Sequence, residues 1–339
     1  TDCPASPDER RTDPWLSFAA DGDLYLAGVP GQRGDVFAIT SVRVERLPRG
    51  AREWGIATTA DQGPAFNDKE ALVADPRRPG VAFVAYTREA AAGWVARTDD
   101  GGATWTAPVR AAPGTQSRPA LGLVPVVLDD GTVLVVYGDP ARGRFRAVRS
   151  RDDGATWSAP RVIGGDRPLN EPGDGAGGTL RTTASNPQVG AHGRRVAVAW
   201  ADVRAKAIRM VVSGDRGRTW RSRRVVTVRG TGTAKPFLPA VAVDRRGVIG
   251  VTYHLLLPGR GRRVDVWFAH SHDGGRTWRR ARVLGPMSLA TAPRAGSSRF
   301  LGDYTGLAAT GRGFVAALVA TGTLAPEGRS DVRVALLRP

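Results

Sequence analysis

Short apolar segments separated by glycine-containing turns recur along the whole chain. Six times, an apolar segment, a turn that contains Gly and a second apolar segment follow one another, and this pattern predicts six β-hairpins. The hairpins are predicted at residues 15–29, 71–86, 120–137, 189–200, 240–253 and 306–319. A third strand is expected after each hairpin, at residues 36–41, 94–97, 145–149, 208–212, 266–270 and 332–337. Fourth, outer strands such as 161–163 and 282–284 would complete most units, and four antiparallel strands per unit are typical of a propeller blade.

One polar motif is repeated in register with four of these units. The pattern Ser/Thr-x-Asp-x-Gly-x-Thr-Trp occurs at residues 98–105, 150–157, 213–220 and 271–278, and we call these four segments the corners. The Asp can accept backbone N–H groups of a tight turn, and the Gly supplies the positive φ that such a turn needs. The Trp then begins the outgoing strand and packs between sheets. We therefore interpret the corner carboxylates as structural.

The corners resemble the Asp-box, or BNR repeat, of the sialidase superfamily, in which each copy lies between the third and fourth strands of a blade. The resemblance implies an all-β, six-bladed β-propeller with four Asp-boxes over residues 13–339. Residues 1–12 are polar and are predicted to form an N-terminal arm that completes the last blade and closes the ring. Two long Gly-rich connections, 164–185 and 285–302, are interpreted as surface loops or as rims of a cleft.

Composition narrows the class of protein further. The chain has 339 residues, 43 Gly and 24 Pro, which suits a turn-rich β protein, and no apolar run long enough to span a membrane. Its net charge of +17 predicts either a dispersed basic surface or a field that attracts anionic glycans. No helical reading element or RNA-binding aromatic motif is present, so nucleic acid is not an expected partner. The single Cys3 excludes an intrachain disulfide and is compatible with a trimmed export or lipid-anchoring region.

Candidate chemistry is expected at the end of the blades opposite the corners. In the sialidase family that end holds a tyrosine nucleophile, a glutamate that activates it, an aspartate general acid and three arginines that bind the substrate carboxylate. Carried onto this chain, the resemblance implies catalytic roles for Tyr304, Asp68, Glu70 and Asp303. It implies substrate contacts from Arg118, Arg204, Arg299, Trp15, Asn186 and Arg88.

Residue chemistry fits those roles in part. A tyrosine nucleophile avoids repulsion by an anomeric carboxylate but needs a nearby base, because its free pKa is about 10. Arginine binds carboxylates through a bidentate fork. Asp68 and Glu70 flank Lys69 on a predicted strand, so regular alternation would place both carboxyls on one face.

We therefore expect an exported, secreted or cell-surface glycoside hydrolase, monomeric and free of obligatory cofactors or metals, that acts on an acidic oligo- or polysaccharide. Two alternatives remain at this stage. The blade starts Asp13-Pro14-Trp15 and Phe237-Leu238-Pro239 lack the arginines of the family, which favours a non-catalytic glycan- or protein-binding propeller. The other alternative is a polysaccharide lyase that acts on uronic acids, in which Tyr304 or His254 removes a proton.

Overall fold

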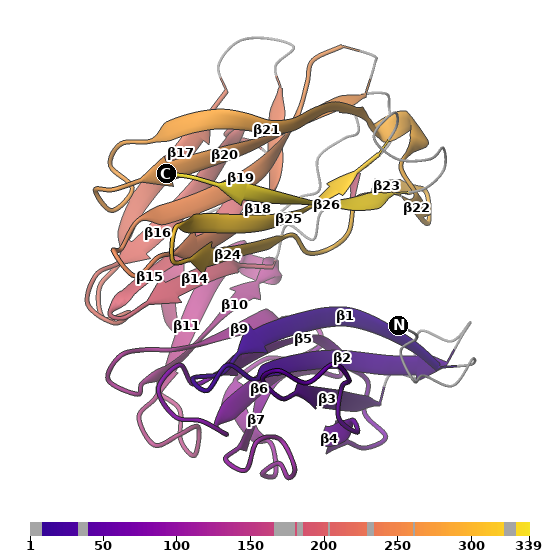
Figure 1. The fold of residues 1–339 in the computed structure, drawn as a ribbon, viewed down its shortest axis with the longest axis vertical. Coiled ribbons are helices and arrows are strands. Elements are labelled where there is room, and N and C mark those ends of the chain that lie inside the picture. Colours follow the sequence, from indigo (N-terminus) through magenta and orange to yellow (C-terminus); the bar gives the residue numbers. More distant parts are fainter. Residues whose placement is uncertain are drawn as a thin grey trace. The chain divides into compact units, whose positions relative to one another are not determined.

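The computed structural model describes residues 9–32, 40–165, 180–181, 186–202, 204–228, 234–259, 262–321 and 330–339. These residues form an all-β chain, with no α-helix among them and two short 3-10 turns, Pro140–Arg142 and Leu289–Thr291. The chain divides into two compact units, with the boundary between residues 167 and 168. Each unit contains three main sheets, which are antiparallel and in which sequence neighbours pair (Figure 1).

The first unit contains three four-stranded sheets. The first sheet consists of β1 (Glu9–Phe18), β2 (Leu24–Gln32), β3 (Ser41–Leu47) and β4 (Thr58–Gln62). The second consists of β5 (Asn67–Ala74), β6 (Ala82–Arg88), β7 (Ala92–Thr98) and β8 (Val109–Ala112). The third consists of β9 (Leu121–Val127), β10 (Val133–Asp139), β11 (Arg144–Ser150) and β12 (Arg161–Gly164). The first strands β1, β5 and β9 of the three sheets lie next to one another.

The second unit repeats this plan. The fourth sheet consists of β14 (Gln188–His192), β15 (Arg195–Asp202), β16 (Ala207–Ser213) and β17 (Arg221–Thr227). The fifth consists of β18 (Lys235–Val243), β19 (Ile249–Leu256), β20 (Arg263–Ser271) and β21 (Arg279–Ser288). The sixth has three strands among the described residues, β24 (Gly306–Thr310), β25 (Gly313–Ala320) and β26 (Asp331–Leu337). A small extra sheet joins β13 (Leu180–Arg181), β22 (Arg294–Ala295) and β23 (Ser298–Phe300).

The six predicted hairpins are all present, and one expectation for the first sheet needs correction. Its third strand is β3 at Ser41–Leu47 rather than residues 36–41, of which 36–39 lie outside the described residues. It also has a fourth strand, β4, although it lacks the corner motif. Residues 9–12 extend β1 and pair with β2. The rest of the N-terminal arm lies outside the described residues, so its completion of the last blade stays a prediction.

Apolar side chains fill the spaces between neighbouring sheets within each unit. Between the second and third sheets the core includes the fully buried Phe83, Leu123 and Val135, packed against the partly buried Trp157 of a corner. A comparable cluster separates the fourth and fifth sheets and includes Tyr253. The β-branched and aromatic residues of the strands supply these clusters, because they pack well on pleated surfaces.

The corners are held by hydrogen bonds from their own polar side chains. In the third sheet, Ser150 Oγ accepts the N–H of Gly154 at 2.7 Å and donates to Asp152 Oδ1 at 2.7 Å. The backbone N–H of Thr156 donates to Asp152 Oδ1 at 2.9 Å, and the Thr156 hydroxyl donates to Oδ2. Hydrogen bonds from Thr156 lower the pKa of Asp152 to about 2. The same bonds recur around Asp100, Asp215 and Asp273. Since the carboxylate oxygens are occupied within the turn, the corners hold the fold.

A second repeated feature lies at the other end of the sheets. In four sheets the first strand carries a β-bulge, where two residues oppose one residue of the second strand. The bulged pairs are Asp13–Pro14 opposite Gly28, Lys69–Glu70 opposite Tyr86, Gly122–Leu123 opposite Tyr137, and Leu238–Pro239 opposite Tyr253. The first residue of each pair has a left-handed backbone, with φ of 55°, 57°, 61° and 45° in that order.

Only one of the four bulges places glycine at the left-handed position. At Asp13, Lys69 and Leu238 the conformation costs about 1 kcal/mol or more, because a Cβ atom crowds the backbone there. Strain of this kind persists where the surrounding structure enforces it, and it is concentrated at functional sites. The bulges therefore indicate that a functional site lies at the end of the sheets where the first strands begin.

Candidate functional site

In the first unit, two bulges bring a lysine and three carboxyl groups together. Lys69 Nζ lies 3.5 Å from Asp13 Oδ2, and both side chains are largely buried. Asp13 and Asp68 share a hydrogen bond, and the charges of Asp13 and Asp68 both act on Glu70. We call Asp13, Asp68, Lys69 and Glu70 the carboxylate cluster. The regular alternation expected for residues 68–70 is wrong, because the bulge interrupts it, and the cluster is assembled by the bulges instead.

Burial makes two carboxyl groups of this cluster, those of Asp68 and Glu70, hard to ionise. Glu70 is almost fully buried, and neither of its carboxyl oxygens has a hydrogen-bond partner among the described residues. Burial, with the negative charges of Asp13 and Asp68, raises the pKa of Glu70 well above its usual value. Burial also raises the pKa of Asp68, and Lys69 opposes that rise. A carboxyl group with a raised pKa keeps its proton to a higher pH and can act as a proton donor.

Replacing Glu70 with Gln should stabilise the protein increasingly as the pH rises. Because the folded pKa of Glu70 exceeds its unfolded value, the protonated group stabilises the fold fully below about pH 4.5, and this contribution is lost as the pH rises through the folded pKa. The Gln side chain stays neutral at every pH, so the variant avoids that loss. The gap in the free energy of unfolding should widen by about 1.4 kcal/mol per unit of pKa shift.

Urea unfolding of wild type and Glu70→Gln across a pH series measures this gap. Glu53→Gln, which changes an exposed carboxyl group, is the control. Parallel pH dependence of wild type and Glu70→Gln would contradict the assignment of a buried, protonated Glu70.

Arg88 lies beside the cluster, at the end of β6. Its Nη2 donates to Asp61 Oδ2 at 2.6 Å, and its guanidinium carbon lies 4.4 Å from the ring centroid of Trp94. Tyr86, opposite the bulge, is fully buried, and its hydroxyl accepts a hydrogen bond from Arg88. Arg88 is thus ion-paired and stacked, which gives it a positioning role in this conformation.

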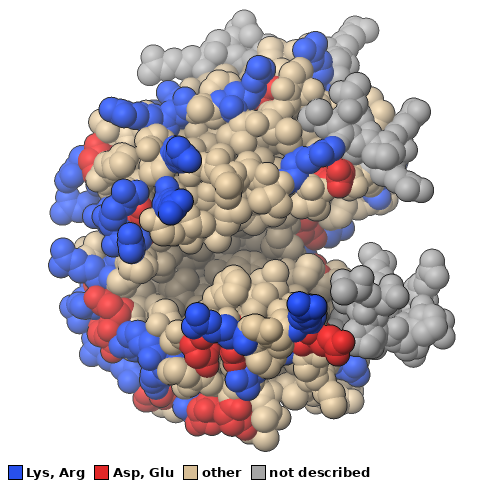
Figure 2. All heavy atoms as spheres, viewed as in Figure 1, with Lys and Arg blue, Asp and Glu red and all other residues tan. Residues whose placement is uncertain are grey.

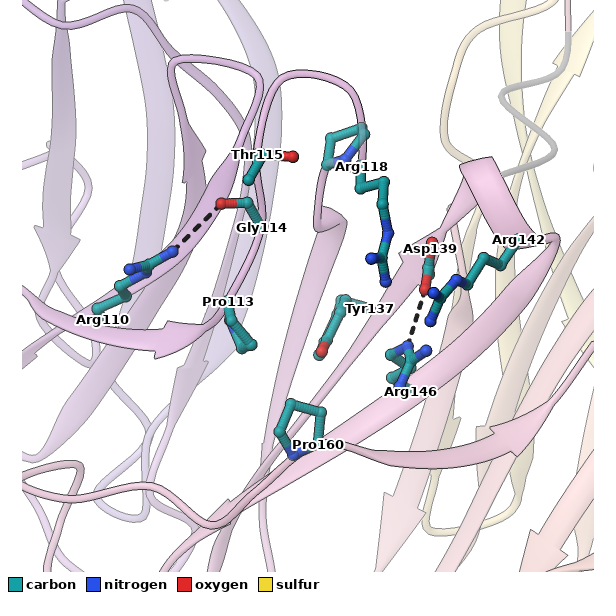
Figure 3. Close-up of a pocket in the computed structure, with 11 residues that line it drawn as sticks. Arg110, Pro113, Gly114, Thr115, Arg118, Tyr137, Asp139, Arg142, Arg146 and Pro160 are labelled. Atoms are coloured by element: carbon teal, nitrogen blue, oxygen red, sulfur yellow. Dashed lines mark hydrogen bonds and ion pairs between the residues drawn. The ribbon is translucent and has the colours of Figure 1, made fainter.

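Arg118 lies in a cavity of about 300 Å³ between the second and third sheets (Figure 3). Three further arginines line the same cavity, Arg110, Arg142 and Arg146. Asp139, whose side chain is largely buried, accepts a hydrogen bond from Arg146 Nε at 2.9 Å. The predicted partners of Arg118 in carboxylate binding, Arg204 and Arg299, belong to the second unit, and a joint role for these three residues stays a prediction.

The remaining predicted catalytic residues lie just before β24 in the second unit. Tyr304 is half-buried there. Asp303 is buried, and its two carboxylate oxygens accept hydrogen bonds from Arg181, at 3.1 Å from Nε and 2.8 Å from Nη2. The guanidinium of Arg181 lies 5.0 Å from the ring centroid of Phe300. This bidentate pair fits a positioning role for Asp303 better than proton donation.

Predicted substrate contacts differ in how accessible the structure leaves them. Arg204 is exposed in the turn after β15, whereas Arg299 donates from Nη1 to the carbonyl of Ala292 at 3.0 Å. Asn186 is buried, and its Nδ2 has no partner within the described part of the chain. Trp15 is half-buried and packs against the core between the first and second sheets.

His254, considered as the base of a lyase, is fully buried. Burial lowers its pKa to about 4, so the ring is neutral at physiological pH. Its Nδ1 lies 3.4 Å from the carbonyl oxygen of Leu238 at the fifth-sheet bulge. A buried ring in this position suits a structural role.

Sequence reasoning assigned no role to several members of these groups. Asp61 and Arg181 lie outside the predicted hairpins, and each meets its partner, Arg88 or Asp303, only through tertiary contact. Asp13 precedes Pro14 at a predicted blade start, and an acidic residue before a Pro is the one local signal that marks it.

Charge on the visible face is mixed rather than gathered in one patch. Figure 2 shows acidic side chains interspersed among the basic ones on the described surface. The residues that the structure describes include no helix with the length and apolar character needed to cross a bilayer.

No protein-family model matches the sequence, and no curated protein matches it. Solved structures do resemble it. A Hadza microbial sialidase, Hz136, has a TM-score of 0.55 and 17% identity, over 96% of this chain and 65% of the sialidase. A leech intramolecular trans-sialidase complexed with 2,7-anhydro-Neu5Ac has a TM-score of 0.58 and 12% identity, over 96% of this chain and 68% of the enzyme. This chain thus spans about two thirds of their lengths.

Smaller enzymes match over nearly their full length. An α-L-arabinanase from Penicillium chrysogenum complexed with arabinobiose has a TM-score of 0.53 and 13% identity, over 96% of this chain and 93% of the enzyme. An α-L-arabinofuranosidase from Fusarium graminearum has a TM-score of 0.53 and 14% identity, over 97% of this chain and 93% of the enzyme. At these identities the likeness shows the fold alone, and that fold is of the β-propeller type found among glycoside hydrolases.

Proposed function

We propose that the protein is a glycoside hydrolase of an acidic glycan, built as a six-bladed propeller whose four corners are Asp-boxes. The observation that carries the proposal is the carboxylate cluster, in which burial and mutual charge raise the pKa values of Asp68 and Glu70. Carboxyl groups tuned in this way are what glycoside hydrolysis requires, because a protonated acid must donate to the leaving-group oxygen.

Accessibility divides the roles within the cluster. Asp68 is only partly buried, so its carboxyl group can reach a glycosidic oxygen and act as the general acid. Glu70 is buried and cannot contact a substrate directly. Because Asp13 and Asp68 disfavour its charged form, we assign Glu70 a positioning role as a neutral group. Tyr304 is proposed as the nucleophile, and its pairing with Asp68 or Glu70 stays a prediction.

The nature of the substrate is argued from charge. Structural neighbours include sialidases as well as enzymes named for the neutral sugar arabinose, so the shared fold leaves the sugar open. The net charge of +17 and the arginine-lined cavity support an anionic substrate. Export to the cell surface or medium and a monomeric state remain part of the proposal.

Turnover of a panel of glycans tests this function. Sialosides, uronic-acid polysaccharides and neutral arabinans should be compared for wild type and Tyr304→Phe. Release of reducing sugar from an acidic substrate, with a large loss in Tyr304→Phe, is the expected result. Product that absorbs in the ultraviolet would indicate a lyase and contradict hydrolysis.

A non-catalytic glycan-binding propeller is favoured by one observation, the engagement of both Asp303 oxygens by Arg181. It predicts that wild type and Tyr304→Phe are equally inactive on every substrate while glycan binding persists. That outcome would replace the hydrolase proposal.

A further inference from the structure

The cavity between the second and third sheets carries an excess of positive charge. Among the residues that the structure describes, four arginines and one carboxylate, that of Asp139, line it. In Figure 3 the guanidinium groups of Arg118, Arg142 and Arg146 converge near that carboxylate. Its volume of about 300 Å³ lies at the lower end of the range for small-molecule sites. A cavity of this charge and size is suited to one small anionic group.

One of these arginines belongs to an ion pair that is repeated in another sheet. In the third sheet Asp139 pairs with Arg146, and in the fourth sheet Asp202 pairs with Arg209 at the same spacing, with an Nε to Oδ2 distance of 2.6 Å. This repeated pair therefore belongs to the fold. Where the third sheet has Arg142, three residues after Asp139, the fourth sheet has Ala205. The turn of the fourth sheet carries its arginine, Arg204, one position earlier, so Arg142 is not part of the repeated pair.

Arg118 and Arg142 are both exposed, and neither guanidinium has a hydrogen bond or ion pair within the described ranges. Unpaired guanidinium groups in a shared cavity repel each other unless an anion lies between them. Arg110 differs, because its Nη2 donates to the carbonyl of Gly114 at 3.2 Å. Two free guanidinium groups are thus available to a ligand.

The loop that carries Arg118 is fixed in place by its backbone. Thr115 and Arg118 exchange two backbone hydrogen bonds, of 3.1 and 2.9 Å, and the N–H of Ala120 donates to the carbonyl of Ala91 at 2.8 Å. Gly114 lets the loop approach closely, since a Cβ atom there would lie 2.1 Å from the Ala91 oxygen. The backbone position of Arg118 is therefore set before a ligand arrives, so that only its side chain has to be ordered on binding.

Rigid apolar groups complete the walls. Pro113, Pro119, Pro160 and the ring of Tyr137 line the cavity beside the arginines. Such surfaces can pack against the C–H face of a sugar ring, while the guanidinium groups bind its charged substituent. An inorganic anion alone would leave those walls without contacts.

We propose that Arg118 and Arg142 bind the carboxylate or sulfate group of an acidic sugar in this cavity, which forms an anionic-sugar subsite in the second and third sheets. The proposal rests on the proposed function for its biological setting, because it places a charged unit of the same glycan here. It assigns Arg118 to a group with Arg142, rather than with Arg204 and Arg299.

Calorimetric titration measures this binding without any turnover. The ligands are a glucuronate-containing disaccharide, its sulfated counterpart, the neutral disaccharide and inorganic sulfate. The variant is Arg118→Ala/Arg142→Ala, and the control is Arg52→Ala/Arg151→Ala, which removes two exposed arginines and the same net charge. We expect at least one acidic disaccharide to bind wild type and the control alike, more weakly at high salt, and to bind the cavity variant about tenfold or more weakly.

Equal affinity of the cavity variant and the control for every acidic sugar would overturn the proposal, and so would binding of the neutral disaccharide as tightly as the acidic ones. Preference for the uronic or the sulfated sugar identifies the anion and supports it. Binding of inorganic sulfate alone would mark an ion site and contradict a sugar subsite. If no glycan is hydrolysed but the acidic sugar still requires Arg118 and Arg142, the proposed function fails and the subsite stands. If an acidic glycan is hydrolysed and the cavity variant binds acidic sugars normally, the subsite proposal fails and the proposed function stands.

Discussion

Asp68→Asn is expected to lower kcat/KM on the hydrolysed glycan by about 10² to 10⁴-fold, the usual contribution of a general acid. Asn has the shape of Asp but cannot donate a carboxyl proton to the leaving-group oxygen. Burial raises the pKa of Asp68, so the wild-type carboxyl group keeps this proton to a higher pH than a free Asp does. Initial rates and thermal melting should be measured on the same preparation.

The control for this variant is Asp331→Asn, which neutralises an exposed acid on β26. It should leave the rate unchanged. A rate of Asp68→Asn within twofold or so of wild type, with an intact fold, would remove Asp68 from the proposed mechanism.

Arg78→Met is expected to cost about 2 to 4 kcal/mol of the free energy of unfolding. Arg78 Nε donates to Asp75 Oδ2 at 2.7 Å, and its two terminal nitrogens donate to Asp153 at 2.8 and 2.7 Å. Asp75 has a fully buried side chain, so removing Arg78 leaves a buried carboxylate with weaker partners. Arg78 itself is more than a third exposed, which places the expected cost below that of a fully buried pair.

Chemical denaturation at low and high salt measures this effect. Arg151→Met, at an exposed arginine in the same corner as Asp153, is the matched control and should be neutral. An unfolding free energy of Arg78→Met equal to that of Arg151→Met would show that this bridge between the second sheet and the third-sheet corner adds nothing to stability.

Regular parts of the fold were predictable from the sequence because each unit repeats the same local rules. The leading Ser, the Asp, the Gly and the Thr of a corner hydrogen-bond to one another within eight residues, so the motif specifies its own turn. The glycine turns at Gly80 and Gly131 have positive φ and join strands close to the predicted ones. Both signals are local, and local signals can be recognised in a single sequence.

Features that depend on tertiary structure were not predictable in this way. The left-handed conformations of Lys69 and Leu238 contradict the intrinsic preferences of those residues, so only their surroundings can enforce them. β4 has no corner motif before it, and β13 pairs with β23 from a distant part of the chain.

The candidate site shows the same division. Asp68, Glu70 and Arg118 were found by their place at strand starts, but the partners that define their chemistry come from other strands or loops. Asp13 acts on Glu70 across the junction of the first and second sheets. Arg142 joins the cavity of Arg118 from the turn after β10.

The central claim is that the strand-start end of the sheets carries the chemistry and the corners carry the fold. Initial hydrolysis rates of Asp68→Asn and Asp152→Asn, normalised to the folded fraction of each protein, compare the two ends directly. The account predicts a loss of about 100-fold or more for Asp68→Asn and a wild-type rate for folded Asp152→Asn. A normal rate for Asp68→Asn together with a large loss for Asp152→Asn would contradict it.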